Sequence, residues 1–172
     1  PPTPDHLAGI EAATGSLGHG LPIGLGMALS ARIQKQTYKV IALLGDGECN
    51  EGSVWEAAMM AAAQKVDNLT VIIDFNKWQA TGRSEEILAL TPLVDKWQAF
   101  GWDACEINGN DMGQLVDVLN KEKNSDGKPT AVIAHTVKGK GVSFMEDDNN
   151  WHYRIPSKEE LTSAHKELGL VE

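Results

Sequence analysis

The sequence has few cysteines, few basic residues and no long uninterrupted apolar run. Cys49 and Cys105 stand apart, without the spacing of zinc ligands or a disulfide framework, so we expect a reducing compartment, the cytoplasm. No apolar stretch reaches the roughly 18 residues of a membrane span, and no signal-peptide pattern is present. Acidic residues outnumber basic ones by 24 to 15, and the net charge of −9 argues against nucleic acid or an anionic membrane as a partner.

The chain has the length and apolar content of one globular domain. At 172 residues, 42% of them hydrophobic, it can bury a substantial core. It shows no internal repeat, low-complexity tract or interdomain linker, so we expect a single domain over residues 1–172. Its first residue is Pro1 rather than Met, and we expect the domain to be incomplete at its N-terminus.

Short apolar runs alternate with helical patterns along the chain. The apolar runs predict buried strands, and the segments between them predict helices. The expected strands are 39–44, 69–75, 102–108 and 130–137, and the expected helices are 20–36, 53–65, 93–100, 111–123 and one that Ser157 begins with a capping box. This order predicts an α/β fold with a mostly parallel sheet and helices on both faces. We expect 1–5 to be extended and 123–129 to form a turn.

Two of the expected helices differ in their apolar patterns. Helix 53–65 is apolar almost all round, which indicates a buried helix that another chain partly covers. Helix 111–123 is amphipathic, and its apolar positions are expected to face inward: Met112, Leu115, Val116 and Leu119.

A glycine-flanked aspartate follows the first expected strand. Gly45 and Gly47 let the backbone turn sharply around Asp46, at the strand end where α/β sheets bind ligands. The next expected strand ends near Asn76, so a carboxylate and an amide oxygen come from neighbouring strand ends. These are hard oxygen donors of the kind that Mg²⁺ prefers, with phosphate oxygens and water completing its shell. The pattern predicts a metal-diphosphate site that takes Mg²⁺, or Ca²⁺ or Mn²⁺ in its place.

These motifs, with others in the same order, resemble the transketolase family, which binds thiamine diphosphate. The matching segments are TGSLGHG at 14–20, GDGE at 45–48, EGSVWEA at 51–57, DNL at 67–69, the D-x-N-x-x-Q-x-x-G frame at 74–82 and KGKG at 138–141. The resemblance runs from Thr3 to Pro156. The chain is similar in particular to the N-terminal subunit of split bacterial transketolases. The resemblance implies that the chain has the thiamine diphosphate-binding fold and forms its diphosphate-binding domain.

The resemblance also implies a cofactor site. It assigns metal binding to Asp46, Asn76 and the main-chain carbonyl of Trp78. Further cofactor-binding positions are implied at Gly15, Ser16, Leu17, Gly45, Gly47, Glu48, Asn76 and Glu51. Two interpretations of Glu51 stay open, because it also suits a favourable charge at the start of a helix. The resemblance implies instead that Glu51 lies at a subunit interface and communicates between two cofactor sites.

Two histidines are the catalytic candidates. His152 matches the family's Trp-His element and is implied to assist proton transfer near the diphosphate; the alternative is a surface loop histidine. Tyr153 stands where many relatives have glycine or histidine. His19 is implied to contact cofactor or substrate, and the alternative is a loop histidine bonded to the backbone. The lysines of the 138–141 loop suit either phosphate binding or a solvated turn.

The implied activity is transfer of a two-carbon ketol unit from a ketose or ketose phosphate to an aldose or aldose phosphate, in pentose phosphate chemistry. We expect the pyrimidine-binding domain of the family to be absent from this chain, and we expect a C-terminal partner subunit that carries it and a heterotetramer of two chains of each kind. Alternatives are a 1-deoxyxylulose-phosphate synthase-like or dihydroxyacetone synthase-like half, or a non-catalytic protein of the same fold. A nucleotide-binding module is disfavoured because the required glycine-rich loops are missing.

Overall fold

The computed structural model describes residues 7–121 and 126–170. Four strands form one parallel sheet in the order β1 (Val40–Gly45), β2 (Leu69–Phe75), β6 (Thr130–His135) and β5 (Asp103–Asn108). This arrangement confirms the predicted α/β fold, and the strands match the expected runs to within one or two residues.

The pairing of β1 with β2 determines which residues meet at the carboxyl edge of the sheet. Gly45 at the end of β1 lies opposite Asp74 in β2, and Asp74 in turn lies opposite Ala134 in β6. The loops that carry Asp46 and Asn76 therefore leave the sheet side by side.

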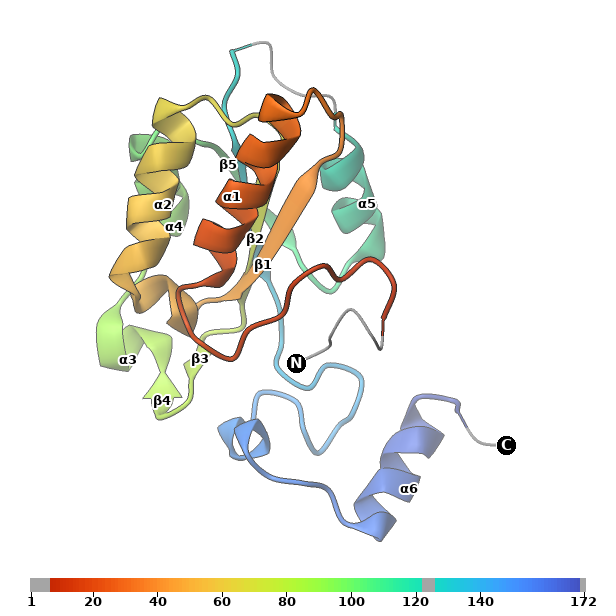
Figure 1. The fold of residues 1–172 in the computed structure, drawn as a ribbon. Coiled ribbons are helices and arrows are strands. Elements are labelled where there is room, and N and C mark those ends of the chain that lie inside the picture. The colour runs from red at the N-terminus through yellow and green to blue at the C-terminus, as the bar shows by residue number, and fades with distance from the viewer. Residues whose placement is uncertain (1–6, 122–125, 171–172) are drawn as a thin grey trace.

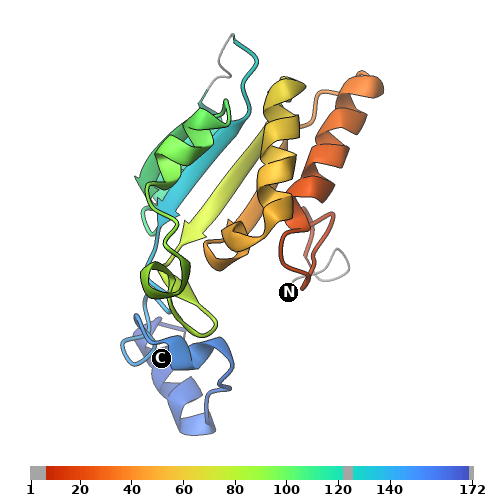
Figure 2. The ribbon, with the colours of Figure 1, turned by 90° about the vertical axis from the view of Figure 1, so that its left-hand side faces the viewer.

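Helices cover the two faces of the sheet unequally. One face carries α1 (Gly20–Ile33), α2 (Gly52–Ala63) and α4 (Leu93–Ala99), which stand in a row in Figure 2. The other face carries α5 (Met112–Asn120), seen on the far side of the sheet from α2 in Figure 1. The main core lies between the three-helix layer and the sheet, where Trp97, Leu44 and Ile73 are fully buried. Within the described residues, no helix is long and apolar enough to cross a membrane.

The expected burial of α5 is wrong in part. Met112 is 69% and Val116 51% exposed, although Leu115 and Leu119 are half-buried as the pattern predicts. On the same face Leu43 of β1 is also 69% exposed, because α5 packs on the β5 side and leaves the β1 side open. The helix pattern is amphipathic, but its outer apolar positions have no protein surface to pack against. The last expected positions, 122–123, lie outside the described residues, as do 1–5 and part of the 123–129 turn.

Helix α2 is buried on one side only. Its buried residues are Val54, Ala57, Ala58 and Ala61. Met59 and Met60 are 53% and 46% exposed on its outer side, so the helix presents an apolar surface outward. This chain alone buries one side of α2, and the expectation that another chain covers part of the helix stays a prediction.

Several short elements at the carboxyl edge carry no clear sequence pattern. They are the 3-10 turn η1 (Gly47–Asn50), the hairpin β3 (Trp78–Gln79) with β4 (Gly82–Arg83), α3 (Ser84–Leu88) and the 3-10 turn η2 (Asn149–His152). The C-terminal helix α6 (Lys158–Glu167) begins with the predicted capping box of Ser157 and Glu160. The segment from η2 to α6 lies beyond the carboxyl ends of the strands in both Figure 1 and Figure 2.

Candidate functional site

Asp46 is the buried centre of the carboxyl edge. Asp46 directly follows β1 in the sequence, and the residue is 1% exposed. One carboxylate oxygen accepts the Gly47 N–H at 2.8 Å; the other accepts the Lys77 N–H at 3.0 Å and the Ser84 hydroxyl at 2.7 Å. Burial raises the pKa of Asp46 above its ordinary value, although these hydrogen bonds act in the opposite direction. The structure thus holds a carboxylate whose negative charge is costly without a nearby cation.

Asn76 lies beside Asp46 at the end of the neighbouring strand. Its amide oxygen accepts the Trp78 N–H at 2.9 Å, and its amide nitrogen donates to Asp74 at 3.3 Å. Asp74 also accepts a short hydrogen bond from the Thr136 hydroxyl. This chain of contacts fixes the amide and keeps its oxygen on the side of the 76–78 turn.

Lys77 connects the two predicted ligands through an uncommon backbone conformation. Its φ of 68° is left-handed, and its N–H donates to Asp46. Among the described residues, four non-glycine residues have positive φ. Lys35 and Lys65 follow helices, where such a conformation is common, whereas Lys77 and Asp147 lie in loops at the candidate site.

The donor set of this loop fits a hard divalent cation. No group of three or more His, Cys, Asp or Glu side chains in the described part of the chain is arranged to hold a metal. The predicted ligands are instead three oxygens with one charge, from Asp46, the Asn76 amide and the Trp78 carbonyl. The Lys77 N–H joins Asp46 to the 76–78 turn, in which the Trp78 N–H donates to the Asn76 amide oxygen. Mg²⁺ bound to phosphate oxygens commonly uses so few protein ligands.

The 14–20 loop packs against the same edge. The Gly18 N–H donates to Glu48 at 2.9 Å, and the Ser53 hydroxyl donates to the Gly18 carbonyl at 2.8 Å. Gly18 has a φ of +80°, and a Cβ there would collide with the Ser53 hydroxyl oxygen, so only glycine fits. The loop thereby brings the exposed 15–17 segment to the side of η1.

His19 and Glu51 flank this contact. The Nδ1 atom of His19 lies 3.0 Å from the carbonyl oxygen of Leu17, so Nδ1 carries the proton in this bond. This geometry is that of the backbone-bonded alternative, and Nε2 is left facing outward as an acceptor. Glu51 is the exposed N-cap residue of α2, and within the described residues its carboxylate makes no capping hydrogen bond. Its Cβ packs close to Gly18.

His152 is the last residue of η2. The chain folds back here, so that His152 lies near Lys138, which precedes it by 14 positions. Its Nδ1 lies 3.3 Å from the Lys138 ammonium, and its ring meets Tyr153 edge-on at 4.6 Å. Lys140 pairs with Glu146 at 3.0 Å. The two lysines of the 138–141 loop are therefore engaged within their own segment.

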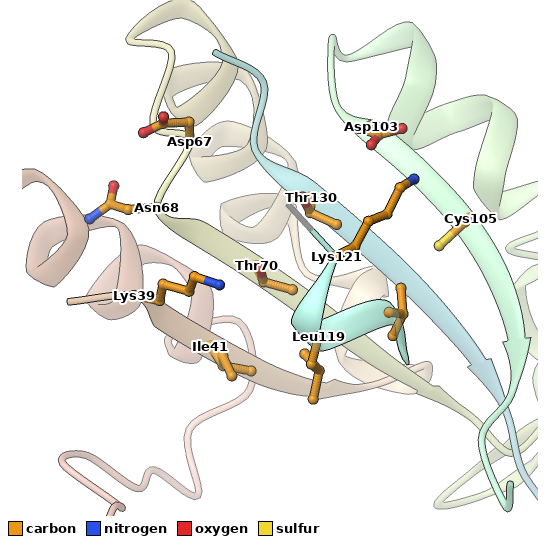
Figure 3. Close-up of a pocket in the computed structure, with 11 residues that line it drawn as sticks. Lys39, Ile41, Asp67, Asn68, Thr70, Asp103, Cys105, Leu119, Lys121 and Thr130 are labelled. Atoms are coloured by element: carbon orange, nitrogen blue, oxygen red, sulfur yellow. The ribbon is translucent and has the colours of Figure 1, made fainter. Parts of the chain in front are cut away.

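The described residues line two cavities, and the larger one adjoins residues that donate hydrogen bonds to Asp46. A hollow of about 50 Å³ at the amino ends of the strands is shown in Figure 3, where Lys39, Thr70, Thr130 and Asp103 lie at or next to the starts of the four parallel strands. A larger one, about 470 Å³, lies beside the hairpin and is lined by Lys77, Arg83 and Ser84 among others. Neither cavity is lined by Asp46 or Asn76.

Sequence reasoning missed the residues that support the ligands. Ser84 is 2% exposed and bonds to Asp46 across 38 positions, and Thr136 reaches Asp74 across 62. The indole of Trp78 donates to Asp147, so this side chain fastens a neighbouring loop. A serine or threonine after a strand is too common to indicate such a role.

Comparison with known proteins shows the family of this chain. The family described as "Transketolase, thiamine diphosphate binding domain" matches residues 1–172. Over 162 residues the chain is 46% identical to one subunit of the apulose-4-phosphate transketolase of Phocaeicola vulgatus. It is 39% identical over 160 residues to the 6-deoxy-6-sulfo-D-fructose transketolase subunit SqwG of a Clostridium species. These matches cover 94% and 93% of this chain but 58% of each relative, so the chain spans less than two thirds of their length.

A solved structure shares the fold. Transketolase from Campylobacter jejuni superimposes with a TM-score of 0.86 at 29% identity, covering 94% of this chain and 26% of that one. The strand-end aspartate, the following asparagine turn and the full-length family match lead to one conclusion. The chain belongs to the transketolase family and matches its thiamine diphosphate-binding domain.

Proposed function

We propose that this chain is the diphosphate- and Mg²⁺-binding half of a split transketolase. The observation that supports this most strongly is the contact between Asp46 and the 76–78 turn. The Lys77 N–H donates to the buried Asp46 carboxylate, and Lys77 directly follows Asn76, whose amide oxygen is the second proposed metal ligand. In this proposal Asp46, Asn76 and the Trp78 carbonyl hold the metal, and the metal neutralises both the carboxylate and the diphosphate.

The surrounding backbone forms the rest of the cofactor site. Gly45, Gly47 and Glu48 lie along the turn that would receive the diphosphate, while Gly15, Ser16 and Leu17 would meet the aminopyrimidine. When bound, thiamine diphosphate supplies the chemistry that carries a two-carbon ketol unit from a ketose to an aldose. The protein supplies orientation and charge compensation.

The two histidines are assigned different roles. His152 would exchange a proton with substrate oxygens through Nε2, because Nδ1 faces Lys138. His19 would accept a hydrogen bond through its outward Nε2, since Nδ1 is committed to Leu17. A positioned acid or base of this kind contributes about 10²–10⁴-fold to a rate.

A second kind of chain would complete the active site. Two relatives are named as subunits of transketolases, and the apolar outer side of α2, with Met59 and Met60 exposed, suits contact with another chain. We assign the pyrimidine-binding domain to that partner and place Glu51 at an interface between two cofactor sites. The assembly would contain two chains of each kind.

The substrate would be a ketose with an anionic group at its far end. The names of the relatives include a sugar phosphate and a sulfo-sugar, so phosphate and sulfonate donors both belong in the test. Ketol transfer is measured with this chain alone and with the protein encoded beside it, in thiamine diphosphate and Mg²⁺. Activity only in the mixture is expected. No activity in a mixture that binds the cofactor would exclude ketol transfer from the donors tested.

A further inference from the structure

An ion pair joins the hairpin after Asn76 to the segment that carries His152. The guanidinium of Arg83 donates to both carboxylate oxygens of Asp147, at 2.7 and 2.6 Å. The indole of Trp78 donates to the same carboxylate at 2.8 Å, and the guanidinium lies 3.7 Å from the centre of the Trp78 ring. Asp147 thus has three donors from the two strands of one hairpin.

The backbone of Asp147 is also held by a contact within its own segment. Its φ of 57° is left-handed, a conformation that aspartate and asparagine tolerate better than most residues. Its N–H donates to the Lys138 carbonyl at 2.9 Å, and the Lys138 ammonium lies 3.3 Å from Nδ1 of His152. A continuous path of contacts therefore leads from the hairpin through Asp147 to His152.

A second tether lies two residues further along. The side-chain amide of Asn149 donates to the carbonyls of Gln79 and Ala80, at 2.9 and 3.2 Å. Asn149 opens η2, the turn that His152 ends. Both tethers use the same hairpin, so the segment is attached at two points to the loop that follows Asn76.

We propose that Asp147, paired with Arg83, is a positioning residue that fixes the segment carrying His152 against the 78–83 hairpin. The inference rests on the proposed function only for the chemical role of His152. An exposed ion pair usually contributes little, but this one is bidentate, is stacked on an indole and lies at a constrained backbone position. The pKa of Asp147 is lowered to about 2, chiefly by its hydrogen bond to Arg83, which agrees with a well-formed pair.

Loss of the pair should separate turnover from cofactor binding. His152 must lie within hydrogen-bond reach of the reacting group, and small misplacements lower rates strongly. Asp46 accepts its hydrogen bonds from Gly47, Lys77 and Ser84, and the Asn76 amide oxygen accepts the Trp78 N–H. These two proposed ligands therefore retain their contacts when Asp147 is changed, and Trp78 loses only the hydrogen bond of its indole.

The test uses hydrogen exchange of the chain in its complex with the partner, thiamine diphosphate and Mg²⁺. Arg83→Met removes the donors, and Asp147→Asn removes the charge while keeping a residue that tolerates the left-handed backbone. Glu146→Gln is the matched control, because it breaks the neighbouring pair with Lys140 without touching the hairpin. Peptides within 144–152 are expected to exchange about tenfold faster in the first two variants and at the wild-type rate in the control.

The kinetic readout accompanies the exchange data. The first two variants are expected to lower kcat about tenfold, with the cofactor Kd within about threefold of wild type. Unchanged exchange in Arg83→Met, or equal acceleration in Glu146→Gln, overturns the proposal. An inactive wild-type mixture would instead exclude ketol transfer from the donors tested, and the exchange data would still decide whether Asp147 fixes the segment.

Discussion

The two edges of the sheet carry similar residue types in different settings. At the amino edge, Asp67 is exposed and Asp103 is half-buried, around the small hollow of Figure 3. At the carboxyl edge, Asp46 is 1% exposed and accepts three hydrogen bonds. The carboxyl edge therefore holds a buried charge that a cation would compensate, and the amino edge holds charges that water can solvate.

The largest difference between the edges should appear on removal of Asp46. Asp46→Ala takes away the charged metal ligand and is expected to weaken Mg²⁺-dependent thiamine diphosphate binding by more than about 100-fold in the assembled enzyme. Tryptophan fluorescence titration measures this affinity. Asp103→Ala at the amino edge is the control, with an expected change below about twofold. Equal affinity of Asp46→Ala and wild type would remove the metal-ligand assignment.

A change at His152 should act on turnover rather than on affinity. His152→Ala is expected to lower kcat about 100-fold, because it removes a positioned proton donor or acceptor, with little change in the cofactor Kd. Steady-state kinetics of the complex give both constants, and His165→Ala in α6 serves as the control. If the Kd rises while kcat is preserved, His152 belongs to the cofactor clamp.

Support of Asp46 by Ser84 should have an intermediate effect. Ser84→Ala removes one hydrogen bond that orients the carboxylate, and Mg²⁺ affinity is expected to fall about tenfold. Ser30→Ala, which removes a hydroxyl from α1 near the amino edge, is expected to leave it within about twofold. Metal titrations of the two variants compare the edges directly, and equal Mg²⁺ affinity for both would refute the supporting role of Ser84.

The smallest effect concerns Lys65 and Lys77, whose backbones are in the left-handed conformation. Lys65 follows α2 with a φ of 51°, and Lys65→Gly is expected to raise the free energy of unfolding by up to about 1 kcal/mol without changing cofactor affinity. Lys77→Gly relieves similar strain but loosens the turn between two ligands, so Mg²⁺ affinity should fall a few-fold. Chemical denaturation and metal titration separate the two outcomes. A loss of stability in Lys65→Gly would contradict the capping argument.

The main elements could be predicted from the sequence because their signals are local. Apolar runs located the four strands of the parallel sheet, and the glycines around Asp46 indicated the turn at the carboxyl edge. The Ser157 capping box likewise indicated the start of α6. Each signal lies within a few residues of the element it predicts.

The remainder depends on contacts between distant parts of the chain. The two-residue strands β3 and β4 are too short to show periodicity, and Arg83 meets Asp147 across 64 positions. The burial of α5 was misjudged because periodicity shows which side of a helix is apolar without showing how much surface it meets. Exposed Met112 illustrates this limit.

The most direct test of the proposed metal-diphosphate site is a calorimetric titration of thiamine diphosphate into the complex of this chain with its partner. It is run once in Mg²⁺ and once in EDTA. We predict saturable binding of one cofactor per chain in Mg²⁺ and its loss in EDTA, because the metal joins the diphosphate to Asp46 and Asn76. Equal affinity in the two conditions would contradict a metal-diphosphate site at the carboxyl edge.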